Sequence, residues 1–232
     1  MGNKIVIVLF WIFVFQAQGQ LSQNNEVGGG LGVFTYSGDL VRNFNLLYSK
    51  PAATVFYRRN VNKIVSFRAG ITFGKIGATD NRNPIDAFAA QRKQSFNLTM
   101  FEFSGVYEYH FLDWRDSKRR IRFTPYLFGG IGLFVFSGNK PKPVGYSNAQ
   151  LSIPFGGGIK YVINPKWYLA AEFGVRKTFF DYLDNVSGAD PSRKTYNQGN
   201  SFDNDNYFFV GITLSRTFYD IPCPTSPYKK VL

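Results

Sequence analysis

Apolar and polar residues alternate with a period of two along most of the chain beyond residue 20. The stretch VSFRAGITFG (65–74) is typical, because every second side chain is apolar and those between are Ser, Arg, Gly or Thr. A β-strand places successive side chains on opposite faces, so this pattern predicts strands with two different surroundings. Eight segments have the pattern: Glu26–Tyr36, Ala52–Arg59, Ile64–Ile76, Phe96–Phe111, Ile121–Phe136, Ser152–Ile163, Trp167–Thr178 and Asn206–Phe218.

The fourth of these segments changes phase along its length. Its apolar face is formed first by Phe96, Leu98 and Met100 and then by Phe101 and Phe103. An extra residue in one strand moves all following side chains to the other face. The sequence therefore predicts a β-bulge near Met100.

The connections between the predicted strands alternate between short and long. Three are short: 60–63, 112–120 and 164–166. Four are long and polar: 37–51, 77–94, 137–151 and 181–205. In an antiparallel array the two kinds lie at opposite ends, as in bacterial outer-membrane barrels with tight periplasmic turns and extended outer loops. An even number of strands also returns both termini to the side of the short turns.

The two faces of the predicted strands differ in chemistry. One is continuously apolar, whereas the other carries Gly, Ser, Thr and Tyr with a few charges: Glu26, Arg68, Glu102, Glu108, Lys160, Glu172 and Arg176. The inside of an eight-stranded barrel is only wide enough for side chains to fill it, which suits glycines and paired charges. A closed barrel also pairs every backbone polar group in lipid. We therefore expect an all-β, eight-stranded antiparallel transmembrane β-barrel over residues 20–218, with an ion-pair network inside.

A soluble lipocalin-like barrel or sandwich is the alternative, because it also alternates apolar and polar residues. Its outer face would be rich in Lys and Glu, whereas the polar face of these strands is mainly Gly, Ser, Thr and Tyr. Aromatic residues near the strand ends favour the membrane barrel, in which they form interfacial girdles. These residues are Tyr36, Tyr57, Tyr107, Tyr109, Tyr126, Tyr161, Trp167, Tyr168 and Tyr182.

The first 19 residues have the order of a secretory signal peptide. Lys4 is followed by an apolar run (5–15) and by small residues at Ala17 and Gly19. The apolar run is too short for a membrane-spanning helix, which needs about 20 residues. We expect cleavage after Gly19, export, and a periplasmic tail over residues 219–232.

Composition changes this picture little. The formal net charge of +12 could indicate a nucleic-acid partner. However, the basic residues are scattered, no nucleic-acid motif is present, and an export signal precedes them, so we expect no nucleic-acid partner. Cys223 is the single cysteine, so an internal disulfide is excluded. His110 is the single histidine, and it has no convincing serine and acid around it, so we expect it to contact headgroups. The sequence predicts a non-enzymatic protein with no metal or cofactor site.

Four stretches carry a resemblance to a known family: GGGLGVFTYSGDL (28–40), TPYLFGGIG (124–132), PFGGGIKYVINPKW (154–167) and EFGVRKTFFDYLDNVS (172–187). In this order they resemble the PorG family of outer-membrane barrels, components of the type IX secretion system of Bacteroidota. The resemblance implies a non-enzymatic protein of the outer membrane that anchors the periplasmic ring formed by PorK and PorN. The tail after Phe218 is not covered by the resemblance.

If the protein contacts such a ring, we expect the contact on the side of the short turns. The residues there with the composition of an interface are Trp114, Arg115, Lys118, Arg119 and Arg120, with Tyr228, Lys229 and Lys230 of the tail. Basic residues beside a membrane can instead bind anionic headgroups. At the opposite end Asp39, Asp181 and Asp184 form an acidic rim or only shape turns, and turns are favoured because Asp is common in them.

Two other functions stay open. A stand-alone small barrel of the OmpA or OmpX kind would act as an adhesin or stabilise the membrane, without a periplasmic partner. A pore is less compatible with a filled interior. Phe218, the last apolar strand residue, resembles the terminal aromatic residue that barrel-assembly machinery reads.

Overall fold

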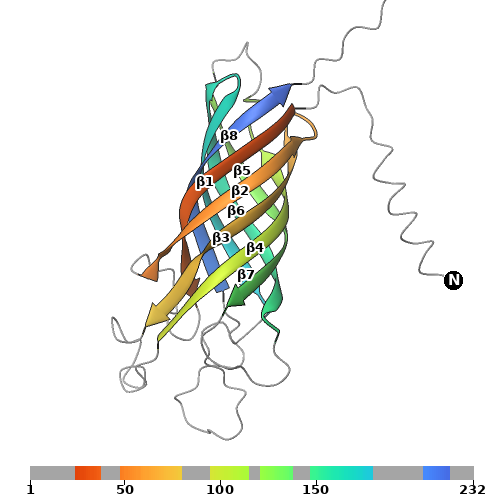
Figure 1. Ribbon diagram of the computed structural model, residues 1–232. Coiled ribbons are helices and arrows are strands. Elements are labelled where there is room, and N and C mark those ends of the chain that lie inside the picture. Colours follow the sequence, from red (N-terminus) through yellow and green to blue (C-terminus); the bar gives the residue numbers. More distant parts are fainter. Residues whose placement is uncertain are drawn as a thin grey trace, which may run out of the picture.

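The computed structural model describes residues 24–37, 48–79, 95–114, 121–137, 147–179 and 206–219, which form one closed barrel (Figure 1). Its strands are β1 (Asn24–Ser37), β2 (Lys50–Asn60), β3 (Val65–Thr79), β4 (Ser95–His110), β5 (Phe123–Ser137), β6 (Ala149–Asn164), β7 (Trp167–Thr178) and β8 (Asn206–Tyr219). Each strand pairs antiparallel with the next, and β8 pairs with β1 to close the sheet. The sheet therefore has no open edge.

The strands are long enough to cross a bilayer. The shortest, β2, has 11 residues and the longest have 16, whereas a tilted transmembrane strand needs about 9–11. Figure 1 shows the strands inclined to the axis of the barrel. Among the described residues, none forms a helix with the length and apolar character that crossing a membrane requires.

The two ends of the barrel differ in their connections. The β2–β3, β4–β5 and β6–β7 connections lie at the same end as the start of β1 and the end of β8, and we call it the short-turn end (Figure 1). Asn62 shapes one of these turns, because its Oδ1 accepts the backbone N–H groups two and three residues further on at 2.8 and 2.6 Å. Asn164 does the same in the β6–β7 turn, at 2.9 Å to both. Such Asx turns allow the chain to reverse its direction within a few residues. The opposite end is called the loop end.

All eight predicted strands are confirmed, and each strand end lies within three residues of its predicted position. The predicted bulge near Met100 is wrong, because β4 pairs with β3 and β5 in unbroken register through this residue. Leu98 and Met100 point into an apolar cluster inside the barrel, whereas Phe101 and Phe103 point outward. The pattern changes phase because the lumen itself becomes apolar toward the loop end. The register of β4 with its neighbours does not change.

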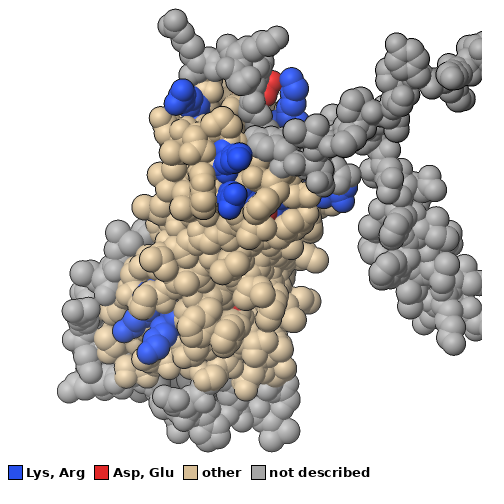
Figure 2. Space-filling model, turned by 45° about the horizontal axis from the view of Figure 1, so that its top comes forward, with Lys and Arg blue, Asp and Glu red and all other residues tan. Residues whose placement is uncertain are grey.

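The outward-facing side chains of the strands form an apolar belt. Leu31, Ile131 and Val55 are 75%, 73% and 63% exposed, and most outward positions on the other strands are also apolar. The middle of the face seen in Figure 2 is accordingly almost entirely free of charged side chains. An exposed apolar surface of this extent marks a membrane or protein contact, and a belt around a closed barrel fits a bilayer. The membrane barrel therefore describes this surface better than the soluble alternative.

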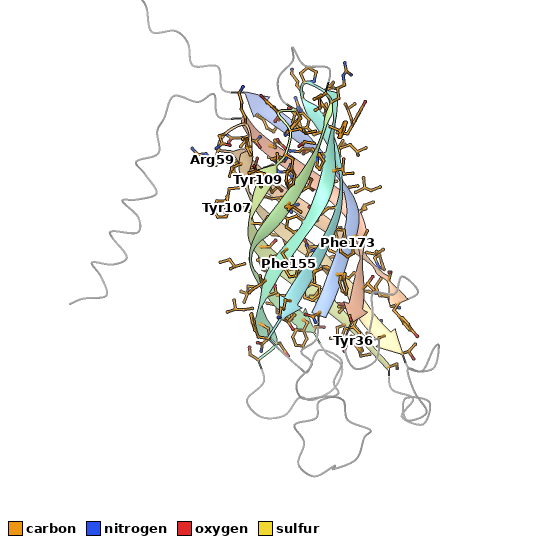
Figure 3. The ribbon with its side chains drawn as sticks, turned by 180° about the vertical axis from the view of Figure 1, so that it is seen from behind. Tyr36, Arg59, Tyr107, Tyr109, Phe155 and Phe173 are labelled. Atoms are coloured by element: carbon orange, nitrogen blue, oxygen red, sulfur yellow. The ribbon has the colours of Figure 1, made fainter. Side chains whose placement is uncertain are left out.

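The aromatic girdle predicted from the sequence is confirmed in part. Outward-facing members near the short-turn end are Tyr57, Tyr107, Tyr109, Tyr161 and Trp167. Figure 3 shows Tyr107 and Tyr109 at this end of the barrel. An outward-facing position near one end of the barrel is that of side chains at a membrane–water interface.

Three tyrosines assigned to this girdle lie inside the barrel instead. Tyr36, Tyr126 and Tyr168 are at most 4% exposed, so for them the prediction is wrong. They occupy inward-facing positions, and small neighbours make room for them: a side chain on Gly158, opposite Tyr126 on β6, would meet the Tyr126 ring. Tyr182 lies outside the described residues.

Candidate functional site

The lumen of the barrel contains a balanced set of buried charges. The seven charged residues predicted to face inward are all buried, at 8% exposure or less, which confirms the expected interior location. Arg58, 1% exposed, joins them. The prediction missed Arg58, although it alternates with Thr54 and Phe56 on the inward face of β2. With Arg58 the set has four carboxylates and four cations (Glu26, Glu102, Glu108 and Glu172 with Arg58, Arg68, Lys160 and Arg176), so their formal charges cancel.

Glu26 on β1 is the centre of one half of this network. Its Oε2 lies 2.7 Å from Arg58 Nη1 on β2 and 2.9 Å from Lys160 Nζ on β6. Asn60 Nδ2 donates to its Oε1 at 2.7 Å, and Ser215 Oγ donates to its Oε2 at 3.2 Å. A fully buried carboxylate is tolerated only when it is paired and hydrogen-bonded, and Glu26 satisfies both conditions.

Glu108 on β4 links the two central arginines. Its Oε2 lies 2.7 Å from Arg58 Nε, and its Oε1 lies 2.8 Å from Arg68 Nε. Arg68 continues the chain, with Nη1 2.7 Å from Glu172 Oε2 on β7, and the hydroxyl of Tyr126 donates to the same oxygen at 3.1 Å. Together with Glu26 and Lys160, the charges of six strands are thereby joined across the interior, in a region where the low dielectric strengthens each contact.

A smaller charged pair lies nearer the loop end. Arg176 Nε on β7 is 3.3 Å from Glu102 Oε2 on β4, and the hydroxyl of Tyr207 donates to that oxygen at 2.6 Å. Beyond this pair the lumen is apolar and aromatic. Its buried members are Phe34, Tyr36, Tyr48, Ala52, Ile76, Ala78, Leu98, Met100, Phe134, Phe136, Tyr207 and Phe209. The interior thus changes from ionic near the short-turn end to apolar near the loop end.

Little space is left between these two parts. A cavity of about 10 Å³ lies against Arg68, Glu172, Arg176 and Phe128. This is about the room that one water molecule needs. Within the described part of the barrel, the lumen is therefore a packed core and contains no continuous channel.

Trp114, in the β4–β5 connection, covers the lumen at the short-turn end. It is 3% exposed, its ring meets Tyr168 edge-on at a centroid distance of 4.7 Å, and Lys160 Nζ lies 4.5 Å from its centroid. This side chain was predicted to contact a partner on the surface. Burial against Lys160 and Tyr168 removes Trp114 from that surface and makes it part of the barrel interior.

His110 also lies inside rather than at the headgroups, so that expectation is wrong. It is fully buried between the rings of Trp114 and Tyr126, at centroid distances of 5.7 and 5.4 Å. Its Nε2 is 3.4 Å from Ser66 Oγ and 3.5 Å from Glu108 Oε2. A catalytic relay uses the two ring nitrogens for the two partners, whereas here one nitrogen faces both. Among the described residues, no group of His, Cys, Asp and Glu is arranged to hold a metal ion.

The remaining predicted site residues fall outside the described part of the chain. They are Arg115, Lys118, Arg119, Arg120, Tyr228, Lys229 and Lys230 of the expected partner surface, and Asp39, Asp181 and Asp184 of the expected outer rim. Cys223 and the tail after residue 219 lie outside it as well. Their roles stay predictions.

Solved structures of outer-membrane barrels share this architecture. Neisserial surface protein A (NspA) is 12% identical, with a TM-score of 0.52 over 84% of this chain and 97% of that chain. A major outer membrane protein of Thermus thermophilus is 16% identical, with a TM-score of 0.50 over 85% of this chain and 100% of that one. At such identities the likeness establishes the fold, a closed eight-stranded antiparallel barrel of the small outer-membrane type. Among curated proteins, no match to the sequence was found.

The sequence itself matches one protein family over almost its whole length. The match runs from residue 3 to residue 226 and so includes all eight strands of the barrel. The chain therefore belongs to the family described as domain of unknown function DUF6089.

Proposed function

We propose that the protein is a non-enzymatic, non-conducting barrel of the outer membrane that acts through its lipid-facing surface and its two ends. The observation that supports this proposal is the filled lumen, in which an ionic network and an aromatic cluster leave a cavity of only about 10 Å³. A stand-alone small barrel, which stabilises the membrane or adheres to another surface through its outer loops, is the simplest function of this kind. In this proposal the loop end is extracellular and the short-turn end is periplasmic.

Conductance across planar lipid bilayers tests the proposal. The purified barrel should insert without producing stable currents, because the described lumen has no continuous water path. A wide porin, whose larger strand number leaves an aqueous channel, serves as the positive control for the measurement. Stable large currents from the purified barrel would overturn the proposal in favour of a pore.

Anchoring of a secretion machine is the second candidate function. It is favoured by the resemblance to the PorG family, which would make a periplasmic ring of the PorK and PorN kind the partner. The burial of Trp114 adds a structural argument, because it fixes the chain at the barrel mouth immediately before the basic segment 115–120. The exposed side chains Lys63, Arg122 and Lys166 lie at the same end.

Co-purification from detergent-solubilised outer membranes separates the two candidates. Retrieval of a periplasmic ring supports the anchor, and a clean monomer supports the stand-alone barrel. Replacement of Arg115, Lys118, Arg119 and Arg120 by Glu should weaken ring association without unfolding the barrel. The matched control is Lys166→Glu, which reverses an exposed charge at the same end but in the β6–β7 turn, and it should retain the ring. Unchanged co-purification of the first variant would remove the turn from the interface.

A further inference from the structure

A groove of about 680 Å³ runs across the outside of the barrel from β1 to β6. It arises where small outward-facing residues lie between large ones. Ala69 on β3 and Gly105 on β4 are paired neighbours, with Tyr57 on β2 and Ile131 on β5 on either side of them. The groove is therefore a gap in the side-chain cover of the apolar belt, and it faces the lipid.

Aromatic side chains bound this groove toward the short-turn end. Phe67, next to Ala69 on the outward face of β3, leans over Gly105, since a Cβ on Gly105 would lie 3.6 Å from its ring. Phe67 in turn packs edge-on against Tyr107 at a centroid distance of 5.3 Å. In hydrocarbon, atoms that line a gap lose dispersion contacts unless something of matching shape fills it. A flexible acyl chain has the chemistry and the cross-section to do so.

A cation lies beside the groove at the level of the headgroups. Arg59 is two residues beyond Tyr57 on the outward face of β2, pairs in register with Phe67, and is exposed. Its guanidinium has no hydrogen-bond or ion-pair partner among the described residues. Figure 3 shows Arg59 at the same end of the barrel as Tyr107 and Tyr109. Arginine is suited to a phosphate because its planar fork can donate two parallel hydrogen bonds.

The charges around the belt also argue for a lipid rather than a second copy of the chain. On the described strands the exposed charged side chains are all basic: Arg59, Lys75, Lys177 and Arg216. The four strand carboxylates are buried in the lumen. Two copies packed belt to belt would bring like charges together, whereas an anionic headgroup complements them.

We propose that the groove at Ala69 and Gly105, together with Arg59, binds one anionic phospholipid, with its phosphate on Arg59 and an acyl chain in the groove. The proposal rests on the orientation given above, which places the short-turn end in the phospholipid leaflet. The bound lipid would stay with one side of the barrel as the barrel moves in the membrane. The outer surface of β2 to β5 would then depend on whether the lipid is bound.

Native mass spectrometry of the detergent-purified barrel tests this site with phosphatidylglycerol and phosphatidylcholine as competing probes. One phosphatidylglycerol should stay bound in preference to phosphatidylcholine. Arg59→Gln should lower its retention about fivefold, the factor that corresponds to about 1 kcal/mol per basic residue near an anionic surface. Gly105→Leu and Ala69→Leu should lower the retention of both lipids, because they fill the groove. Both positions accept a larger side chain, since Ala69 is exposed and a Cβ on Gly105 makes ordinary contacts at 3.6 and 3.8 Å.

Two matched variants control for general effects. Lys166→Gln removes an exposed cation at the same end but in the β6–β7 turn, and it should leave retention unchanged. Gly129→Leu enlarges an outward-facing glycine that does not line the groove, where a Cβ would meet nothing within 4 Å. Equal retention of both lipids, or unchanged retention in the Arg59 and groove variants, would overturn the proposal. So would a dimer that the groove variants dissociate, or preferred retention of lipid A. Conductance by the purified barrel would overturn the proposed function, but it would not change the lipid retention measured by mass spectrometry.

Discussion

Lys160 on β6 and Glu26 on β1 meet inside the barrel although they are 134 residues apart, with Lys160 Nζ 2.9 and 3.1 Å from the two carboxylate oxygens. Strands β1 and β6 are not neighbours in the sheet, so this contact ties together walls that the backbone ladder does not connect. The contact between Arg68 on β3 and Glu172 on β7 does the same. The ionic part of the lumen therefore cross-braces the barrel.

Removal of one charge from this network should destabilise the folded barrel. We expect Glu26→Gln to lower the free energy of unfolding by about 3–5 kcal/mol, because Arg58 and Lys160 would lose a carboxylate that neutralises them in a buried site. Urea unfolding of the barrel in lipid vesicles measures this effect.

The exposed pair Lys63–Asp113 provides the control. Its atoms are 3.2 Å apart, but the Lys63 side chain is 75% exposed and that of Asp113 is 19% exposed. We expect Lys63→Ala to change the free energy of unfolding by less than about 1 kcal/mol. Equal effects of the Glu26 and Lys63 variants would show that the interior network does not brace the barrel.

Two adjacent glycines on β5 should respond in opposite ways to the same substitution. A Cβ on Gly130, which faces inward, would collide with the carbonyl oxygen of Gly105 and lie 2.7 Å from the Cα of Val106. These are backbone atoms that cannot rotate away, so Gly130→Ala should destabilise the barrel by about 1–3 kcal/mol. A Cβ on outward-facing Gly129 meets nothing within 4 Å. Gly129→Ala should stabilise it by about 0.4–1 kcal/mol through the unfolded chain.

The urea midpoints of the two alanine variants measure this difference. A midpoint shift of the same sign and size in both would mean that the inward-facing glycine is not required for the close approach of β4 and β5. Gly130 would then be a general strand glycine rather than a packing requirement of the lumen.

The sequence pattern was sufficient to predict the strands and the inward charges, because both depend on alternation within one segment. Arg68, for instance, lies among Ser66, Gly70 and Thr72 on one face of its strand. Arg58 was missed because it adjoins Arg59, and two successive basic residues conceal which of them points inward. The pattern of Thr54 and Phe56 resolves this once the register of β2 is known.

Contacts between distant segments could not be predicted in the same way. Buried Tyr126 and outward-facing Tyr107 each lie opposite a glycine on the next strand, Gly158 and Gly129, so residue type and cross-strand neighbour do not tell the two positions apart. Trp114 lies after the end of β4, where alternation no longer applies. Its position is fixed by Lys160 and Tyr168, far along the chain.

The two tryptophans of the processed chain should report different surroundings. Cleavage after Gly19 would remove Trp11 and leave buried Trp114 and outward-facing Trp167, which are 3% and 37% exposed. In brominated lipid, Trp114→Phe, whose fluorescence comes from Trp167, should be strongly quenched. Trp167→Phe, which reports Trp114, should be quenched much less because its ring is covered by protein. Equal quenching would return Trp114 to the outer surface and restore it as a candidate partner contact.

Phe218 on β8 tests whether the last strand carries a signal for assembly. It is outward-facing and 49% exposed, and the guanidinium of Arg216 lies 5.3 Å from its ring centroid. Phe218→Asp should lower the amount of barrel inserted in the outer membrane, which immunoblotting of membrane fractions measures, whereas Phe218→Tyr should retain it. Phe123→Asp on β5 is the matched control, because this residue is also 49% exposed near the same end. An acidic residue near the interface should cost only about 0–1 kcal/mol, so Phe123→Asp should reduce insertion less. Equal losses would identify general interfacial polarity, rather than recognition of the last strand, as the cause.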